Sequence, residues 1–171
     1  MLTLSVLETG GRETVAGFRQ LATKVSDLSA AWPAIRDLFY QFERLAFETE
    51  GRSSASGKWA GLTERYSKWK ARKYPGRPIL QRTSALMSSL TRTGFGSDVK
   101  SGPLWLQVSS DVEYAQYHQR GTRTMRARKP VALRRDQVAA FGAAVHRHID
   151  RDVMKSLWSR IASETRAKAA A

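Results

Sequence analysis

The residues of this sequence that could do chemistry are three histidines and a run of arginines. His118 and the arginines share the stretch VEYAQYHQRGTRTMRARKPVAL, residues 112–133, which turns at a glycine and then has basic residues without an acid among them. His146 and His148 are two residues apart in a segment with helical periodicity, so they point to nearly opposite faces and cannot chelate one ion together. We expect all three histidines to be structural residues, at the surface or at an interface.

The segment GRSSASGKW, residues 51–59, has the glycines and lysine of a phosphate-binding loop but not its spacing. One residue too many separates Gly51 from Gly57, Trp59 replaces the required Ser or Thr, and a long helix precedes the segment in place of a strand. The chain has no cysteine. Disulfides, thiolate metal sites and cysteine nucleophiles are therefore excluded, and a reducing cytosol fits. We expect a protein that is not an enzyme and that has no cofactor and no bound metal.

Positive charge is concentrated in the later part of the chain. The chain has 29 lysines and arginines against 15 acidic residues, a net charge of +14. Residues 1–50 hold five basic and seven acidic residues, whereas residues 51–171 hold 24 and 8. This asymmetry favours a polyanion or an acidic protein as a partner, with a merely soluble charged face as the alternative.

A second basic cluster is interleaved with aromatic residues, a pattern that could hold phosphates and stack bases. Trp59, Tyr66 and Trp69 are spaced by seven and three residues, which is equally the pattern of a helix face packed in a core. No helix-turn-helix, RNP or zinc-finger signature is present, so the sequence supports non-specific DNA contact and no reading of base sequence. The candidate DNA-channel residues are Lys58, Arg65, Lys68, Lys70, Arg72 and Lys73.

The spacing of apolar residues predicts an α+β fold, with helices packed on a small antiparallel sheet. The clearest element is a long central helix over residues 28–50, with Pro33 in its first turn and Gly51 as its stop. A short strand at 2–7 and a helix at 14–24 precede it. A long C-terminal helix is expected from residue 134 to about residue 162. Residues 1–162 then form a single domain, and residues 163–171 are a frayed or disordered tail.

The middle of the chain predicts shorter elements. One short helix is expected over residues 64–72, capped by Thr63, and another after a cap at Ser84. Two strands, at 91–95 and 103–109, are expected to be joined by the glycine-containing loop GFGSDVKSG. These strands supply the predicted sheet.

Two separated segments together resemble the phage virion morphogenesis family, the tail-completion or neck proteins of Mu-type phages. The first is FETEGRSSASGKWAGLTERYSKWK followed by ILQRTSALMSSL, and the second is VEYAQYHQRGTRTMRARKP. The resemblance covers roughly residues 1–150. Ser84 stands where the family usually has glycine, and Arg120 replaces a common aromatic residue. The matching positions that we expect to be structural are Phe47, Trp59, Leu62, Thr63, Ile79, Leu80, Leu86, Tyr114 and Pro130.

The resemblance implies a structural virion protein of the head–tail junction, which acts in tail completion or head–tail joining. Such a protein is a subunit of a homo-oligomeric ring around the DNA channel, commonly six-fold or twelve-fold. Its partners would be the neighbouring connector or stopper and tail proteins, with weak non-specific contact to DNA and no membrane. Without a recognisable signal peptide or membrane-length apolar run, it is expected in the virion, and in the host cytoplasm during assembly. The alternative is a non-specific DNA-binding accessory protein.

Within this interpretation, the arginine-rich segment after Gly121 is expected to dock onto a neighbouring protein. Tyr114, Tyr117 and His118 would pack their rings inward and hydrogen-bond their polar tips. Charge reversal at Arg126 and Arg128 is expected to abolish docking and to leave the fold intact. The candidate docking residues are Tyr114, His118, Arg120, Gly121, Arg123, Arg126, Arg128 and Lys129.

Overall fold

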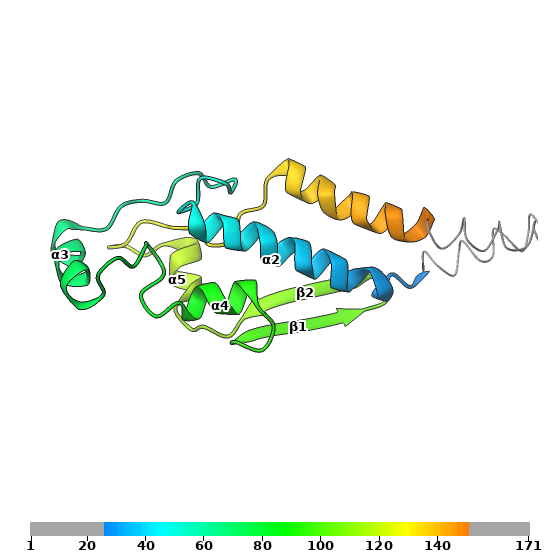
Figure 1. The fold of residues 1–171 in the computed structure, drawn as a ribbon, viewed down its shortest axis with the longest axis horizontal. Coiled ribbons are helices and arrows are strands. Elements are labelled where there is room, and N and C mark those ends of the chain that lie inside the picture. Colours follow the sequence, from blue (N-terminus) through cyan, green and yellow to red (C-terminus); the bar gives the residue numbers. More distant parts are fainter. Residues whose placement is uncertain (1–25, 151–171) are drawn as a thin grey trace, which may run out of the picture.

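The computed structural model describes residues 26–150 and has the predicted α+β architecture. The long helix α2 (Trp32–Glu48) follows a single 3-10 turn, η2 (Ser29–Ala31), and runs along the long axis of the molecule (Figure 1). The hairpin of β1 (Ser97–Gly102) and β2 (Trp105–Ser110) lies on one side of α2 together with α4 (Ala85–Thr91). The helix over residues 135–150 lies on the other side.

Two further helices, α3 (Glu64–Lys73) and α5 (Ala115–Arg120), lie toward the end of the molecule where α2 finishes (Figure 1). The predicted strand at 2–7, the helix at 14–24 and the tail at 163–171 lie outside the described residues. Within residues 26–150, every helix is too short or too polar to serve as a membrane span.

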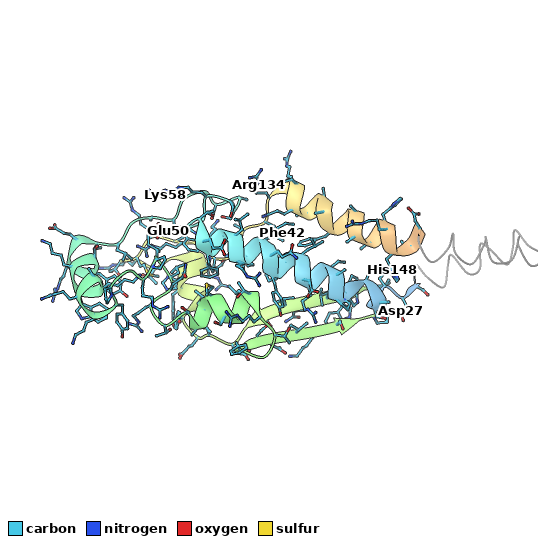
Figure 2. The ribbon with its side chains drawn as sticks, in the orientation of Figure 1. Asp27, Phe42, Glu50, Lys58, Arg134 and His148 are labelled. Atoms are coloured by element: carbon cyan, nitrogen blue, oxygen red, sulfur yellow. The ribbon has the colours of Figure 1, made fainter. Side chains whose placement is uncertain are left out.

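Helix α2 is shorter than the predicted 28–50, but it has the predicted proline in its first turn and the predicted glycine after its end. Pro33 occupies the first turn, where the missing N–H of proline removes no helical hydrogen bond. The helix ends before Gly51, whose φ of +88° is a left-handed conformation that glycine adopts without strain. Phe42 points toward the C-terminal helix and its ring centroid lies 5.7 Å from that of Phe141 (Figure 2). On the sheet side, the Tyr40 hydroxyl is within hydrogen-bond distance of the Ser97 hydroxyl, at 3.2 Å.

The core lies where the C-terminal end of α2 meets α4. Phe47, Trp59, Leu86 and Leu90 are buried and form one apolar cluster. The rings of Phe47 and Trp59 meet edge to face, with centroids 5.3 Å apart, which is a favoured aromatic geometry. Since removing a buried aromatic side chain costs about 3–5 kcal/mol, this pair fixes the loop that contains Trp59 against α2.

The sheet is an antiparallel hairpin, but its first strand is not the predicted one. Strand β1 lies in the segment expected to be a loop, and it pairs with β2 from Ser97↔Ser110 to Gly102↔Trp105. Residues 91–95 are not a strand, because Thr91 completes α4 and its hydroxyl donates to the Met87 carbonyl at 2.8 Å. Polar residues dominate β1, so it has no alternating apolar pattern and is recognisable only from its partner strand.

The two short helices occupy the predicted positions without the predicted caps. Neither Thr63 before α3 nor Ser84 before α4 makes a side-chain capping hydrogen bond. Ser84 instead has φ of +60°, a left-handed backbone conformation in which its side chain cannot act as a normal N-cap. The predicted capping function is therefore wrong at both residues.

Candidate functional site

Three segments that are distant in the sequence meet beside the core. The indole Nε1 of Trp59 donates to the carbonyl oxygen of Lys129 at 3.0 Å. The guanidinium of Arg128 donates from Nε to the Ala60 carbonyl at 2.6 Å and from Nη2 to the Gly61 carbonyl at 2.7 Å. These hydrogen bonds hold the segment around residue 128 against the loop that precedes α3.

The third segment is joined to the end of α2. The Ile79 backbone N–H donates to the Glu50 carboxylate at 3.0 Å, and the Gln81 side-chain amide donates to the Phe47 carbonyl at 2.9 Å. A Cβ on Gly51 would lie 2.6 Å from the Trp59 ring, so only glycine lets this ring approach the helix end. The structure thus brings together residues from both parts of the first motif segment and from the second.

Gly121 sets the course of the arginine-rich segment. Its φ is +78°, and a Cβ there would lie 2.9 Å from the Ala127 nitrogen. The segment folds back on itself through a hydrogen bond from the Thr122 N–H to the Met125 carbonyl at 2.8 Å. Residues 122–127 therefore form a compact loop, which we call the basic loop, and glycine is required at its base.

The predicted docking residues divide into an exposed group and a buried group. The side chains of Arg120, Arg123, Arg126 and Lys129 are exposed. Arg128 is only 7% exposed, and two carbonyl oxygens occupy its guanidinium. Arg128 is therefore a structural residue in this fold, and the expectation that its charge reversal would leave the fold intact has to be corrected.

A cleft of about 490 Å³ lies between α3, α5 and the basic loop. Most of its wall is apolar, with contributions from Leu62, Leu80 and Met125. Three cations, Lys70, Arg82 and Arg128, also line it, and no carboxylate of residues 26–150 does. We call this feature the α3–α5 cleft. Arg82 and Met125 could not be recognised as site residues in the sequence, since only the fold brings them to one wall.

His118 and Tyr114 form one wall of the α3–α5 cleft. Their rings meet edge to face at 5.8 Å, and His118 Nδ1 is buried without a hydrogen-bond partner among the described residues. Burial, and secondly the charge of Arg128, lowers the pKa of His118, so its imidazole is neutral at pH 7. The inward packing expected of the tyrosines is wrong, because Tyr114 is 39% and Tyr117 48% exposed.

Helix α3 presents a basic and aromatic surface. The rings of Tyr66 and Trp69 stack with centroids 5.4 Å apart, and Tyr74 lies 5.8 Å from Trp69. This aromatic group is partly exposed and is separate from the core, whereas Trp59 belongs to the core. Among the candidate DNA residues, those on α3 with exposed side chains are Arg65, Lys68, Arg72 and Lys73.

Two candidate DNA residues differ from these four. Lys70 is buried, and its Nζ donates to the Pro78 carbonyl. Burial lowers the pKa of Lys70, which the charge of Glu50 partly counteracts. Lys58 is exposed but lies on the loop above the end of α2, near Glu50 and away from α3 (Figure 2). Lys70 therefore cannot contact DNA without leaving its carbonyl partner, and Lys58 belongs to a different surface.

The described residues, 26–150, contain no group of three or more His, Asp or Glu side chains placed to hold a metal ion. Comparisons with protein-family models, with curated proteins and with solved structures give no match. The resemblance to the phage virion morphogenesis family therefore rests on the sequence motifs alone.

Proposed function

We propose that this protein is a structural virion protein of the phage head–tail junction, which acts in tail completion or head–tail joining and catalyses no reaction. The observation that carries the proposal is the meeting of the two motif segments around Phe47, Trp59 and Arg128. Residues that a family shares in a fixed order are expected to build one structural unit, and these do so across roughly seventy residues of chain.

The backbone at Ser84 gives a second, independent support. This is the position where the family usually has glycine, and its φ here is +60°. A left-handed conformation is one that glycine adopts freely and serine adopts at some cost. The local geometry therefore explains why glycine is the residue usual in the family at this position.

The exposed charges suit a subunit of a ring. Heterologous contacts, in which one face of a subunit meets a different face of the next, close into rings of fixed size. The basic loop and α3 give one end of the described part of the chain a strong positive charge, while residues 26–50 hold four acidic residues besides the buried Glu43 and two basic residues. Opposite charge on the two parts would steer neighbouring subunits, or an acidic connector or tail protein, into register.

Deletion of the gene from its phage, followed by electron microscopy of the lysate, tests this function. Filled heads separate from tails would indicate head–tail joining, and tails of uncontrolled length would indicate tail termination. Restoring the gene on a plasmid is the control and should restore whole particles. Normal particles from the deletion phage would overturn the proposal.

A second candidate, a non-specific DNA-binding accessory protein, is favoured by one observation. Helix α3 combines exposed cations with the stacked, partly exposed pair Tyr66 and Trp69, which is the combination used to hold a nucleic-acid strand. In a ring subunit the same surface would give only weak contact with DNA passing through the channel. Tight binding to DNA at physiological salt, together with normal particles from the deletion phage, would favour this second candidate.

A further inference from the structure

The turn between β1 and β2 lies at the end of the described part of the chain that is farther from α3 and α5 (Figure 1), and it has exposed apolar residues. We call residues Pro103, Leu104 and Trp105 the hairpin tip. Leu104 is 61% exposed and its neighbour Trp105 is 50% exposed. Adjacent exposed apolar residues of this size are typical of an interaction site.

The hairpin tip is held in one conformation. The Leu28 N–H donates to the Pro103 carbonyl at 2.7 Å, and the Trp32 indole donates to the Gly102 carbonyl at 2.8 Å. Gly102 has no Cβ, and the Trp105 ring occupies the space that a Cβ would need. A rigid apolar projection loses little conformational entropy when it binds, so it is well suited to insert into a cavity.

The α3–α5 cleft has the matching properties. Its volume of about 490 Å³ exceeds that of a single large side chain, and its wall is mostly apolar. The three cations on its lining, with no carboxylate of the described residues beside them, would repel a second basic surface. Charge repulsion therefore disfavours a symmetric pairing in which two clefts face each other.

The described residues beside the hairpin tip include an exposed carboxylate. Asp27, close to the tip, is exposed at that end of the molecule (Figure 2), and Lys100 on β1 is neutralised by Asp98 at 2.8 Å. The exposed carboxylate of Asp27 beside the tip therefore suits the three cations that line the cleft. Because the two features are at opposite ends of the described part of one chain, each subunit has both halves of a contact that it cannot make with itself.

We propose that the hairpin tip of one copy inserts into the α3–α5 cleft of the next copy. Leu104 would enter between Leu62 and Met125, and the Trp105 ring would cover the cleft opening beside the cationic side chains, where its face attracts a guanidinium. The contact is heterologous, so it links copies head to tail and closes a ring where the rotation permits. Its biological purpose rests on the proposed function, but the contact itself can be measured without it.

Disulfide trapping tests the contact cleanly, because the chain has no cysteine of its own. One chain has the substitution Leu104→Cys and a purification tag. The second chain has Thr124→Cys, at the cleft, and no tag. The two are mixed in equal amounts at high protein concentration and oxidised. The mixed disulfide is expected to exceed each homodimer by about tenfold, a preference that a modest contact free energy supplies.

The matched control replaces Thr124→Cys with Ala143→Cys, which is exposed on the C-terminal helix and away from the cleft. That mixture should give only background cross-linking. A chain with both Leu104→Cys and Thr124→Cys should give a ladder of linked oligomers, whereas either single variant should stop at dimers. Three results would overturn the proposal. They are a mixed disulfide no more abundant than the homodimers, a yield no higher than that of the control mixture, and the absence of any disulfide.

Other occupants of the cleft give a different result. Cross-linking of Thr124→Cys to another virion protein in a lysate, with none to Leu104→Cys, would assign the cleft to that protein and overturn self-insertion. Failure of this contact can also be distinguished from failure of the proposed head–tail function. Head–tail defects in the deletion phage without the mixed disulfide would overturn this contact alone, and the mixed disulfide with normal particles would overturn the neck function alone.

Discussion

The guanidinium of Arg128 lies against the backbone of Gly61 and donates to its carbonyl oxygen at 2.7 Å, across 67 residues of chain. The neighbouring Arg126 is exposed and makes no such contact. One arginine of the basic segment is therefore part of the internal framework, and the other is part of the surface. The two side chains have the same chemistry and opposite expected effects when they are changed.

Arg128→Met should destabilise the fold, and Arg126→Met should not. Methionine keeps the length of the side chain but removes two charge-assisted hydrogen bonds, each worth about 1.5–3 kcal/mol, and leaves the Ala60 and Gly61 carbonyls without them. Because the two bonds share one guanidinium and their contributions do not simply add, we expect a loss of roughly 2–4 kcal/mol for Arg128→Met and less than about 0.5 kcal/mol for Arg126→Met, measured as free energies of unfolding in urea. Equal values for the two variants would contradict the structural position of Arg128.

Gly121→Ala should cost more stability than Gly76→Ala. Both glycines have similar left-handed conformations, with φ of +78° and +70°. A Cβ at position 121 would lie 2.9 Å from the Ala127 nitrogen, whereas a Cβ at position 76 would meet nothing within 4 Å. Gly76→Ala is therefore the control, and its loss of stability measures the backbone strain, about 1–2 kcal/mol. The additional loss of stability in Gly121→Ala measures the clash of the Cβ with the basic loop. Thermal unfolding measures both, and an equal loss would show that the basic loop moves aside at no cost.

Glu43 makes the stability depend on pH. Its carboxyl is buried on α2, Oε2 has no hydrogen-bond partner among the described residues, and burial raises the pKa to about 8 from 4.5. Between these two values the folded state keeps a proton that the unfolded state has released. Stability should therefore fall as pH rises through this window, by at most about 1.4 kcal/mol per pH unit.

Glu43→Gln tests that dependence, because glutamine has nearly the same shape and does not ionise. Urea unfolding at about pH 5 and at about pH 8 should show a smaller loss of stability in the variant than in the wild type. Glu48→Gln is the control on the same helix, since Glu48 is exposed, and it should keep the wild-type slope. An unchanged slope in Glu43→Gln would mean that this carboxyl is not the source.

The sequence predicts the parts of the fold that are local. Helix α2 is recognisable because apolar residues recur at helical spacing over 17 residues and are bounded by Pro33 and Gly51. Strand β1 is not, because its polar residues gain their order from pairing with β2. The candidate site residues divide in the same way, because long-range contacts decide which of them are buried. Lys70 and Arg128 are in basic runs, and only the carbonyl oxygens of Pro78, Ala60 and Gly61 decide that these two cations turn inward.

The last prediction separates a docking surface from a DNA surface. Reversing the exposed charges of the basic loop, with Arg123→Glu and Arg126→Glu, should abolish incorporation into particles with little change in DNA affinity. Reversal on α3, with Arg65→Glu and Lys73→Glu, should weaken DNA binding. It should also reduce the slope of log affinity against log salt by roughly one for each DNA phosphate that the variant no longer neutralises.

Each pair of changes alters the net charge by the same amount and spares the buried cations, so long-range electrostatics is matched between the two variants. Arg44→Glu, exposed on α2, is the control for reversal at an unrelated surface. Particle incorporation is measured by quantifying the protein in purified virions from complemented deletion phage, and DNA affinity by fluorescence anisotropy over a range of salt. If both variants lose DNA binding equally and both enter particles, the basic end is one continuous polyanion surface. The docking assignment of the basic loop would then be wrong.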